Sequence, residues 1–209
     1  MLKNITENNY CLVTGSVESE LTLSHEIYDE KFYTFKLKSE RLSESSDIIN
    51  VTLSERLINN NLNLSYGAKI SVSGQFRSYN NYSPIGNKLI LTLFAKDIET
   101  PDIYTEDKNE IYLDGYICKI PIYRVTPFGR EITDILLAVN RIHNKSDYIP
   151  CIAWGRNAKY ASTLEVGERV RIFGRIQSRD YIKKLEDDTE ITKTAYEISV
   201  GKLEKVLNE

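Results

Sequence analysis

The two halves of this chain repeat one another at a spacing of 100 residues, so the chain is expected to fold as two similar units. The best-matched blocks are residues 64–78 and 164–178, in which a leucine precedes a turn glycine and alternating apolar residues continue through a second glycine. Three pairs of glycines lie in register: Gly15 with Gly115, Gly67 with Gly167, and Gly74 with Gly174. Two unrelated β-rich halves would be the alternative, and these pairs argue against it.

Each half alternates apolar and polar residues with a period of two, which is typical of half-buried strands. Strands are expected at residues 10–19, 31–38, 47–53, 68–79 and 88–98, and at residues 111–121, 132–141, 148–154, 169–181 and 194–203. One short helix is expected after the third strand of each half, at residues 55–61 and 157–163, with Asn157 as the N-cap of the second. Gly74 and Gly174 fall inside long strands, where a glycine marks a bulge or a tight bend.

Five strands with a helix between the third and fourth describe an OB fold, a partly open Greek-key barrel. The sequence therefore predicts an all-β protein with short helices, built from two tandem OB-fold five-stranded barrels. Residues 99–109 are polar, include Pro101 and lack periodicity, which is typical of a linker. The expected domains are residues 1–105 and residues 106–209.

The composition and the motifs argue against most enzyme classes. The chain has two histidines and no CxxC, HExxH, GxGxxG, GxxxxGK[ST] or GxSxG pattern, so no catalytic residue, metal site or cofactor is expected. The three cysteines are far apart and odd in number, which favours a reducing compartment over a disulfide framework. No apolar run approaches the length of a membrane span, and the N-terminus lacks the apolar core of a signal peptide. A cytoplasmic protein without a membrane partner is expected.

The second half resembles the bacterial single-stranded DNA-binding protein family from about residue 112 to residue 206. The resemblance rests on LDGY at 113–116, PIYRVTPFGR at 121–130, ILLAVNR at 135–141, DYIPCIAWGRNA at 147–158, VGERV at 166–170 and GRIQSRDY at 174–181. The first half resembles this family only through the repeat and its glycines.

The resemblance implies a non-enzymatic protein that binds single-stranded DNA with little sequence preference. In such binding, aromatic side chains stack on bases, and Lys and Arg contact phosphates. Tyr148, Trp154 and Tyr181 lie where the family has stacking aromatics, and the even spacing of Tyr148 and Trp154 puts both on one face of a regular strand. A core position for Trp154 and an ordinary surface position for either tyrosine remain alternatives. The cations expected beside them are Arg141, Arg156, Lys159, Arg175, Arg179 and Lys183.

The first half carries fewer of these features. Residues 1–105 have 10 basic and 13 acidic residues, whereas residues 106–209 have 17 of each. Ile48 and Ser54 stand at the positions that match Tyr148 and Trp154. The remaining DNA-binding candidates of the first half are Phe76, Arg77 and Tyr79. The second domain is therefore expected to bind DNA more strongly, with the first as a weaker extension or an assembly module.

The resemblance also implies a role in DNA replication, recombination or repair, with replication or repair proteins as partners. Family members commonly assemble four barrels, so a chain with two barrels is expected to form a homodimer. The alternative is a primosome-type or other protein-interaction module built on OB folds, which the acidic first half fits better than the second. Titration with an oligonucleotide separates the two functions.

Overall fold

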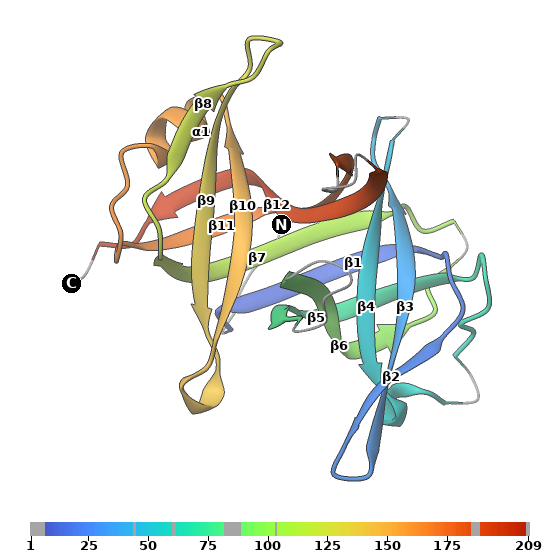
Figure 1. Ribbon diagram of the computed structural model, residues 1–209. Coiled ribbons are helices and arrows are strands. Elements are labelled where there is room, and N and C mark those ends of the chain that lie inside the picture. The colour runs from blue at the N-terminus through green and yellow to red at the C-terminus, as the bar shows by residue number, and fades with distance from the viewer. Residues whose placement is uncertain are drawn as a thin grey trace.

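Two β-barrels lie side by side in the computed structural model, which describes residues 7–43, 45–59, 62–81, 89–102, 104–184 and 189–207 (Figure 1). The first barrel contains β1 (Asn9–Val17), β2 (Thr22–Ile27), β3 (Glu30–Glu40), β4 (Ser46–Ser54), β5 (Lys69–Asn80) and β6 (Leu89–Glu99). The second contains β7 (Lys108–Ile117), β8 (Ile122–Val125), β9 (Glu131–Asn140), β10 (Ser146–Trp154), β11 (Arg169–Lys184) and β12 (Glu190–Lys205). The all-β, tandem OB-fold prediction is confirmed.

The two barrels share one continuous sheet. From the centre of this sheet outward, equivalent strands of the two barrels follow in the same order. The order is β2-β3-β4-β6-β5-β1-β7-β11-β12-β10-β9-β8, and the pairs β1–β3 and β7–β9 close the two barrels. At the centre β1 and β7 run antiparallel, in register from Asn9 opposite Leu113 to Thr14 opposite Lys108. Backbone hydrogen bonds therefore join the barrels directly.

The mid-strand glycines mark bulges, as the sequence predicts. The register shifts between Ser73 and Gly74 in β5 and between Phe173 and Gly174 in β11. A Cβ on Gly74 would overlap the carbonyl oxygen of Phe94, and a Cβ on Gly174 would overlap that of Ser199. A glycine at each bulge lets the long strands β5 and β11 curve against their neighbours.

Branched aliphatic side chains fill both barrels. The fully buried ones include Val13, Leu37, Ile49, Val72 and Leu93 in the first barrel, and Leu113, Leu137, Ile149, Ile172 and Ile198 in the second. Phe76 is 0% exposed and belongs to this core, so the prediction that Phe76 contacts DNA is wrong. The physical reason is strand parity, because Phe76 points to the same side of β5 as the buried Ile70 and Val72.

Three local features differ from the predictions. β2 and β8 were not expected, because every residue of both strands is exposed and neither has the buried face that produces alternation. Glu55–Leu57 forms a 3₁₀ turn in place of the first helix; residues 60 and 61 at the end of the expected helix lie outside the described residues. The second helix is α1 (Arg156–Ala161), whose N-cap is Gly155 and not Asn157, since the Asn157 side chain donates to the Gly201 carbonyl at 3.0 Å.

In the part of the chain that the structure describes, no helix has the length and apolar character needed to cross a membrane.

Candidate nucleic-acid interface

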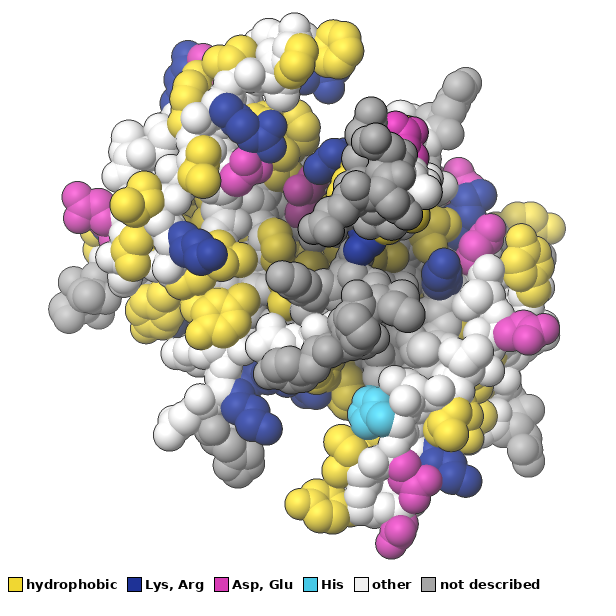
Figure 2. Space-filling model, viewed as in Figure 1, with side chains coloured by type: hydrophobic (Ala, Val, Ile, Leu, Met, Phe, Trp, Pro, Cys, Tyr) yellow, Lys and Arg dark blue, Asp and Glu magenta, His cyan; other side chains and the backbone are white. Residues whose placement is uncertain are grey.

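β10 places two of the predicted stacking residues on the outside of the second barrel. Ile149, Cys151 and Ala153 point inward and are buried, so Tyr148 and Trp154 point outward. Tyr148 is 49% exposed, and Trp154 is half-buried. The neighbouring surface interleaves Lys and Arg with exposed hydrophobic side chains, as Figure 2 shows over this barrel. Exposed rings beside cations are what a single strand needs for stacking and phosphate contact.

Trp154 lies at one end of this surface, beside the start of α1. It lines a shallow pocket of about 500 Å³ together with Arg156, Asn157 and Gly201. Arg156 is exposed there. Lys159, one turn further along, forms an ion pair at 3.1 Å with Glu131. A hydrogen bond from Tyr123, together with this ion pair, holds the pKa of Glu131 below its ordinary value. The positive charge of Lys159 is thus partly neutralised by Glu131. Arg156 is the cation beside Trp154 that is exposed to solvent in this pocket.

Tyr148 lies at the other end of β10, where the second barrel meets the first. The Tyr148 N–H donates to Ser78 Oγ at 2.8 Å, and the Ser78 N–H donates to Asp147 Oδ1 at 2.7 Å. Arg141 Nε lies 3.1 Å from Asp147 Oδ2, and the guanidinium carbon of Arg141 is 5.5 Å from the centroid of the Tyr79 ring. Burial raises the pKa of the Asp147 carboxyl, against the opposing effects of the Ser78 N–H and Arg141. Tyr79 and Tyr148 are therefore brought to one junction from opposite barrels.

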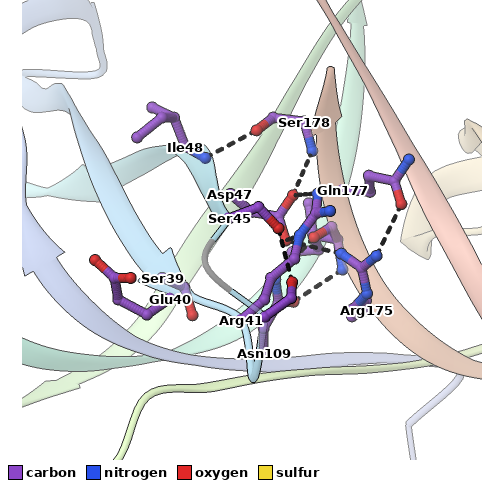
Figure 3. Close-up of polar contacts among 12 residues, drawn as sticks. Ser39, Glu40, Arg41, Ser45, Asp47, Ile48, Asn109, Arg175, Gln177 and Ser178 are labelled. Carbon is purple, nitrogen blue, oxygen red and sulfur yellow. Dashed lines mark hydrogen bonds and ion pairs between the residues drawn. The ribbon is translucent and has the colours of Figure 1, made fainter.

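The repeat builds a matching junction around Asp47, drawn in Figure 3. The Ser178 N–H donates to Asp47 Oδ1 at 2.9 Å, and the Ile48 N–H donates to Ser178 Oγ at 2.9 Å. Arg41 donates two hydrogen bonds to Asp47, at 2.8 and 2.5 Å, and Arg175 Nη1 donates a third at 2.8 Å. Arg175 therefore links the barrels through its hydrogen bond to Asp47, and this geometry gives no support to its predicted phosphate contact.

Tyr181 and Arg179 do not join Tyr148 and Trp154 in one groove, contrary to the expectation of a single cluster. Both are exposed on the β11–β12 hairpin, which extends toward β3 and β4 of the first barrel (Figure 1). Nearby in β12, Tyr196 donates to Asn50 Oδ1 of β4 at 3.4 Å. The side chain of Lys183 lies outside the described residues. The predicted DNA-binding residues are thus distributed along the molecule, from Trp154 past the junction and over the first barrel.

The first barrel carries a row of aromatic side chains that the sequence analysis missed. His25 stacks on Phe32 with centroids 4.9 Å apart, and Phe32 lies 5.8 Å from Phe94. The guanidinium carbon of Arg77 is 3.8 Å from the centroid of the Phe94 ring. We name His25, Phe32, Phe94 and Arg77 the first-barrel row.

A signal for this row was present in the sequence. Tyr33, Phe35 and Leu37 lie on one face of β3, which is the inward face because Phe35 and Leu37 are buried. Phe32 has the opposite parity and therefore points outward. The positions that match Tyr148 and Trp154 do not predict this row, because they lie on β4 and the row lies on other strands.

Comparison with known proteins agrees with this geometry. A protein-family model described as "Single-strand binding protein family" matches residues 108–206 of this chain. Single-stranded DNA-binding protein 2 of Listeria innocua is 35% identical over 80 residues, which cover 35% of this chain and 50% of that protein. Single-stranded DNA-binding protein A of Bacillus subtilis is also 35% identical over 80 residues, covering 35% of this chain and 46% of that protein. The chain thus spans about half the length of the curated relatives it matches.

A solved structure resembles the whole chain. The single-stranded DNA binding protein from Thermus aquaticus superposes with a TM-score of 0.76 at 18% identity, covering 96% of this chain and 94% of that chain. At this identity the likeness shows a shared fold. Residues 108–206 of this chain are thus similar to the single-strand binding protein family, and a second OB-fold barrel precedes them in the same chain.

Proposed function

We propose that this protein binds single-stranded DNA without enzymatic activity and with little sequence preference, in DNA replication, recombination or repair. The observation that carries the proposal is the outer face of β10, where Tyr148 and Trp154 are accessible beside Arg156 and Arg141 within a domain similar to this family. Ring faces stack on any base, and the cations contact phosphates. The Tyr181 and Arg179 hairpin and the first-barrel row would extend the path on which a strand lies.

Titration with oligothymidine at several salt concentrations tests the proposal. We expect binding that weakens as salt rises, because phosphate contacts release counterions. Replacing Trp154 or Tyr148 by alanine should each cost about 1–3 kcal/mol of binding free energy, since each removes one stacking surface. Tyr104→Ala is the matched control, because Tyr104 is 91% exposed and belongs to the chain segment that joins β6 to β7. Equal affinities for all four proteins would argue against stacking on β10.

A second candidate function is a protein-interaction module, and the β8–β9 hairpin favours it. Phe128 at the hairpin tip is 92% exposed, and Ile122 and Val125 on β8 are 63% and 57% exposed. Exposed apolar side chains in one place are typical of interaction surfaces. Capture of a replication or repair protein, together with no binding to oligothymidine, would favour this function over the first.

We also propose the division into domains 1–105 and 106–209, and a homodimer that brings four barrels together. Light scattering coupled to gel filtration is expected to give about twice the chain mass of 24.1 kDa. A mass of one chain across the micromolar range would contradict the dimer, and the barrel pair joined by β1 and β7 would then be the complete binding unit.

A further inference from the structure

A cationic pocket lies at the junction of the two barrels. Its volume is about 570 Å³, and its lining includes Arg77 from β5, Arg141 after β9, and Lys145 before β10. The amide side chains of Asn8, Asn9, Gln75 and Asn140 complete the polar lining. Among the described residues that line it, none is a carboxylate. Three positive charges with amide donors between them form a surface that suits an anion.

The repeat supplies an internal comparison for this pocket. The matching pocket, of about 490 Å³, is lined at the equivalent positions by Arg41, Glu40 and Arg175 where the first has Arg141, Asn140 and Gln75. It also contains Asp47 and Asp107, so three carboxylates face two cations. The two pockets have the same place in the fold, but among the described residues carboxylates line only the second, where Glu40 and Asp107 also pair with Lys38 and Lys69. The positive charge is therefore a property of one junction and not of the fold.

The arginines of the cationic pocket are less fully paired than those of its counterpart. Asp47 accepts hydrogen bonds from both Arg41 and Arg175. Arg77, in contrast, lies over Phe94 and donates to Gln75 Oε1 at 3.0 Å, and its buried Nε finds no hydrogen-bond acceptor among the described residues. Arg141 has an ion pair with Asp147 and donates from Nη2 to the Ser78 carbonyl at 3.4 Å. The outer Nη groups of the two guanidinium groups, and not their buried Nε atoms, are the donors that can bind an anion in the pocket.

The pocket also lies between two sets of aromatic rings. On one side are Tyr148 and Tyr79, the latter 5.5 Å from the Arg141 guanidinium carbon. On the other side Arg77 itself contacts Phe94, from which the first-barrel row continues through Phe32 to His25. Because Arg141 lies beside Tyr79 and Arg77 lies beside Phe94, the pocket offers a path between the two sets of rings.

We propose that the pocket lined by Arg77, Arg141 and Lys145 binds a backbone phosphate of a single strand as the strand crosses from the second barrel to the first. This inference rests on the proposed function and adds to it a path and a phosphate site. The first barrel is then a continuation of the binding surface and not an assembly module.

The test uses the full chain and two lengths of oligothymidine. One is about 30 nucleotides, enough to reach across both barrels, and the other is about 8, enough for one. The test variants are Arg77→Gln and Lys145→Ser, because Gln177 and Ser45 are the residues that the repeat has at these positions. The matched controls are Arg56→Gln and Lys202→Ser, since both cations are exposed and paired with carboxylates away from the pocket.

For the long oligonucleotide, each test variant should weaken binding and reduce the slope of log K against log salt by about 0.7, the value of one single-strand phosphate contact. The short oligonucleotide, held by β10, should bind all variants alike, and the control variants should match the unaltered protein. Lys145 lies in an exposed turn, so Lys145→Ser keeps the test valid if Arg77→Gln fails to fold.

Each of the remaining outcomes contradicts one part of the proposal. If the test variants behave like the controls, the phosphate site is wrong while the proposed function stands. If they weaken both lengths equally, the crossing is wrong. If the unaltered protein binds neither oligonucleotide, the proposed function fails and this inference fails with it.

Discussion

Replacing Phe76 by alanine is expected to lower the free energy of unfolding by about 3–5 kcal/mol. Phe76 is 0% exposed in the first barrel, so its removal leaves a cavity among close-packed aliphatic side chains. The backbone at Phe76 is also fixed, because its N–H donates to Asn9 Oδ1 at 2.9 Å and its carbonyl accepts from Asn9 Nδ2 at 2.8 Å. The surroundings therefore have little freedom to collapse into the space. The midpoint of urea denaturation, followed by circular dichroism, measures the loss.

Tyr79→Ala is the control for this prediction, since Tyr79 is on the same strand but outside the core and should cost about 1 kcal/mol or less. The two variants should behave oppositely toward DNA. The folded Phe76→Ala protein should bind oligothymidine as the unaltered protein does, whereas Tyr79→Ala should bind it less well. A Phe76→Ala protein with unchanged stability and reduced affinity would contradict the core assignment.

Replacing Asp47 by alanine is expected to cost about 3 kcal/mol of folding free energy. The Asp47 side chain is 1% exposed, and its removal leaves Arg41 and Arg175 without their shared carboxylate and the Ser178 N–H without its acceptor. The estimate lies at the low end for a buried ion pair because the side chains of Arg41 and Arg175 are 26% and 33% exposed, and water will solvate them in part.

Asp134→Ala is the comparison, because Asp134 pairs with Arg124 at 2.7 Å but both side chains are well exposed, at 39% and 51%. It should cost less than about 1 kcal/mol. Thermal denaturation of the full chain measures both variants. Equal losses at Asp47 and Asp134 would show that the Asp47 junction contributes no more than a surface ion pair.

Much of the fold could be predicted because the repeat and the period-two alternation record burial directly. Gly74 and Gly174 were informative for the same reason, since only a residue without a Cβ fits against the neighbouring carbonyl. β2 and β8 escaped detection because all of their residues are exposed, and a strand exposed on both faces carries no alternation. The prediction for Phe76 fails because an aromatic residue near a hairpin can also point inward, and Phe76 shares the strand parity of the buried Ile70 and Val72.

The binding surface was harder to predict than the fold. Tyr148 and Trp154 could be placed on one face from their spacing alone, because both belong to one strand. The bonds from Arg175 to Asp47 and from Ser78 to Asp147 join residues far apart in the chain, and no local pattern encodes them. The same is true of the first-barrel row, since the contact between Arg77 and Phe94 depends on which strands become neighbours across the barrel.

The order of Gln and Arg is reversed between the two junctions. One has Gln75 and Arg77, and the other has Arg175 and Gln177, although each arginine still donates to the glutamine beside it. In an assembly of identical subunits, any mutation alters both symmetry-related contacts at once. When both barrels are encoded in one polypeptide, each contact can change separately in evolution. One junction can then keep its role of holding the barrels together while the other acquires a different role.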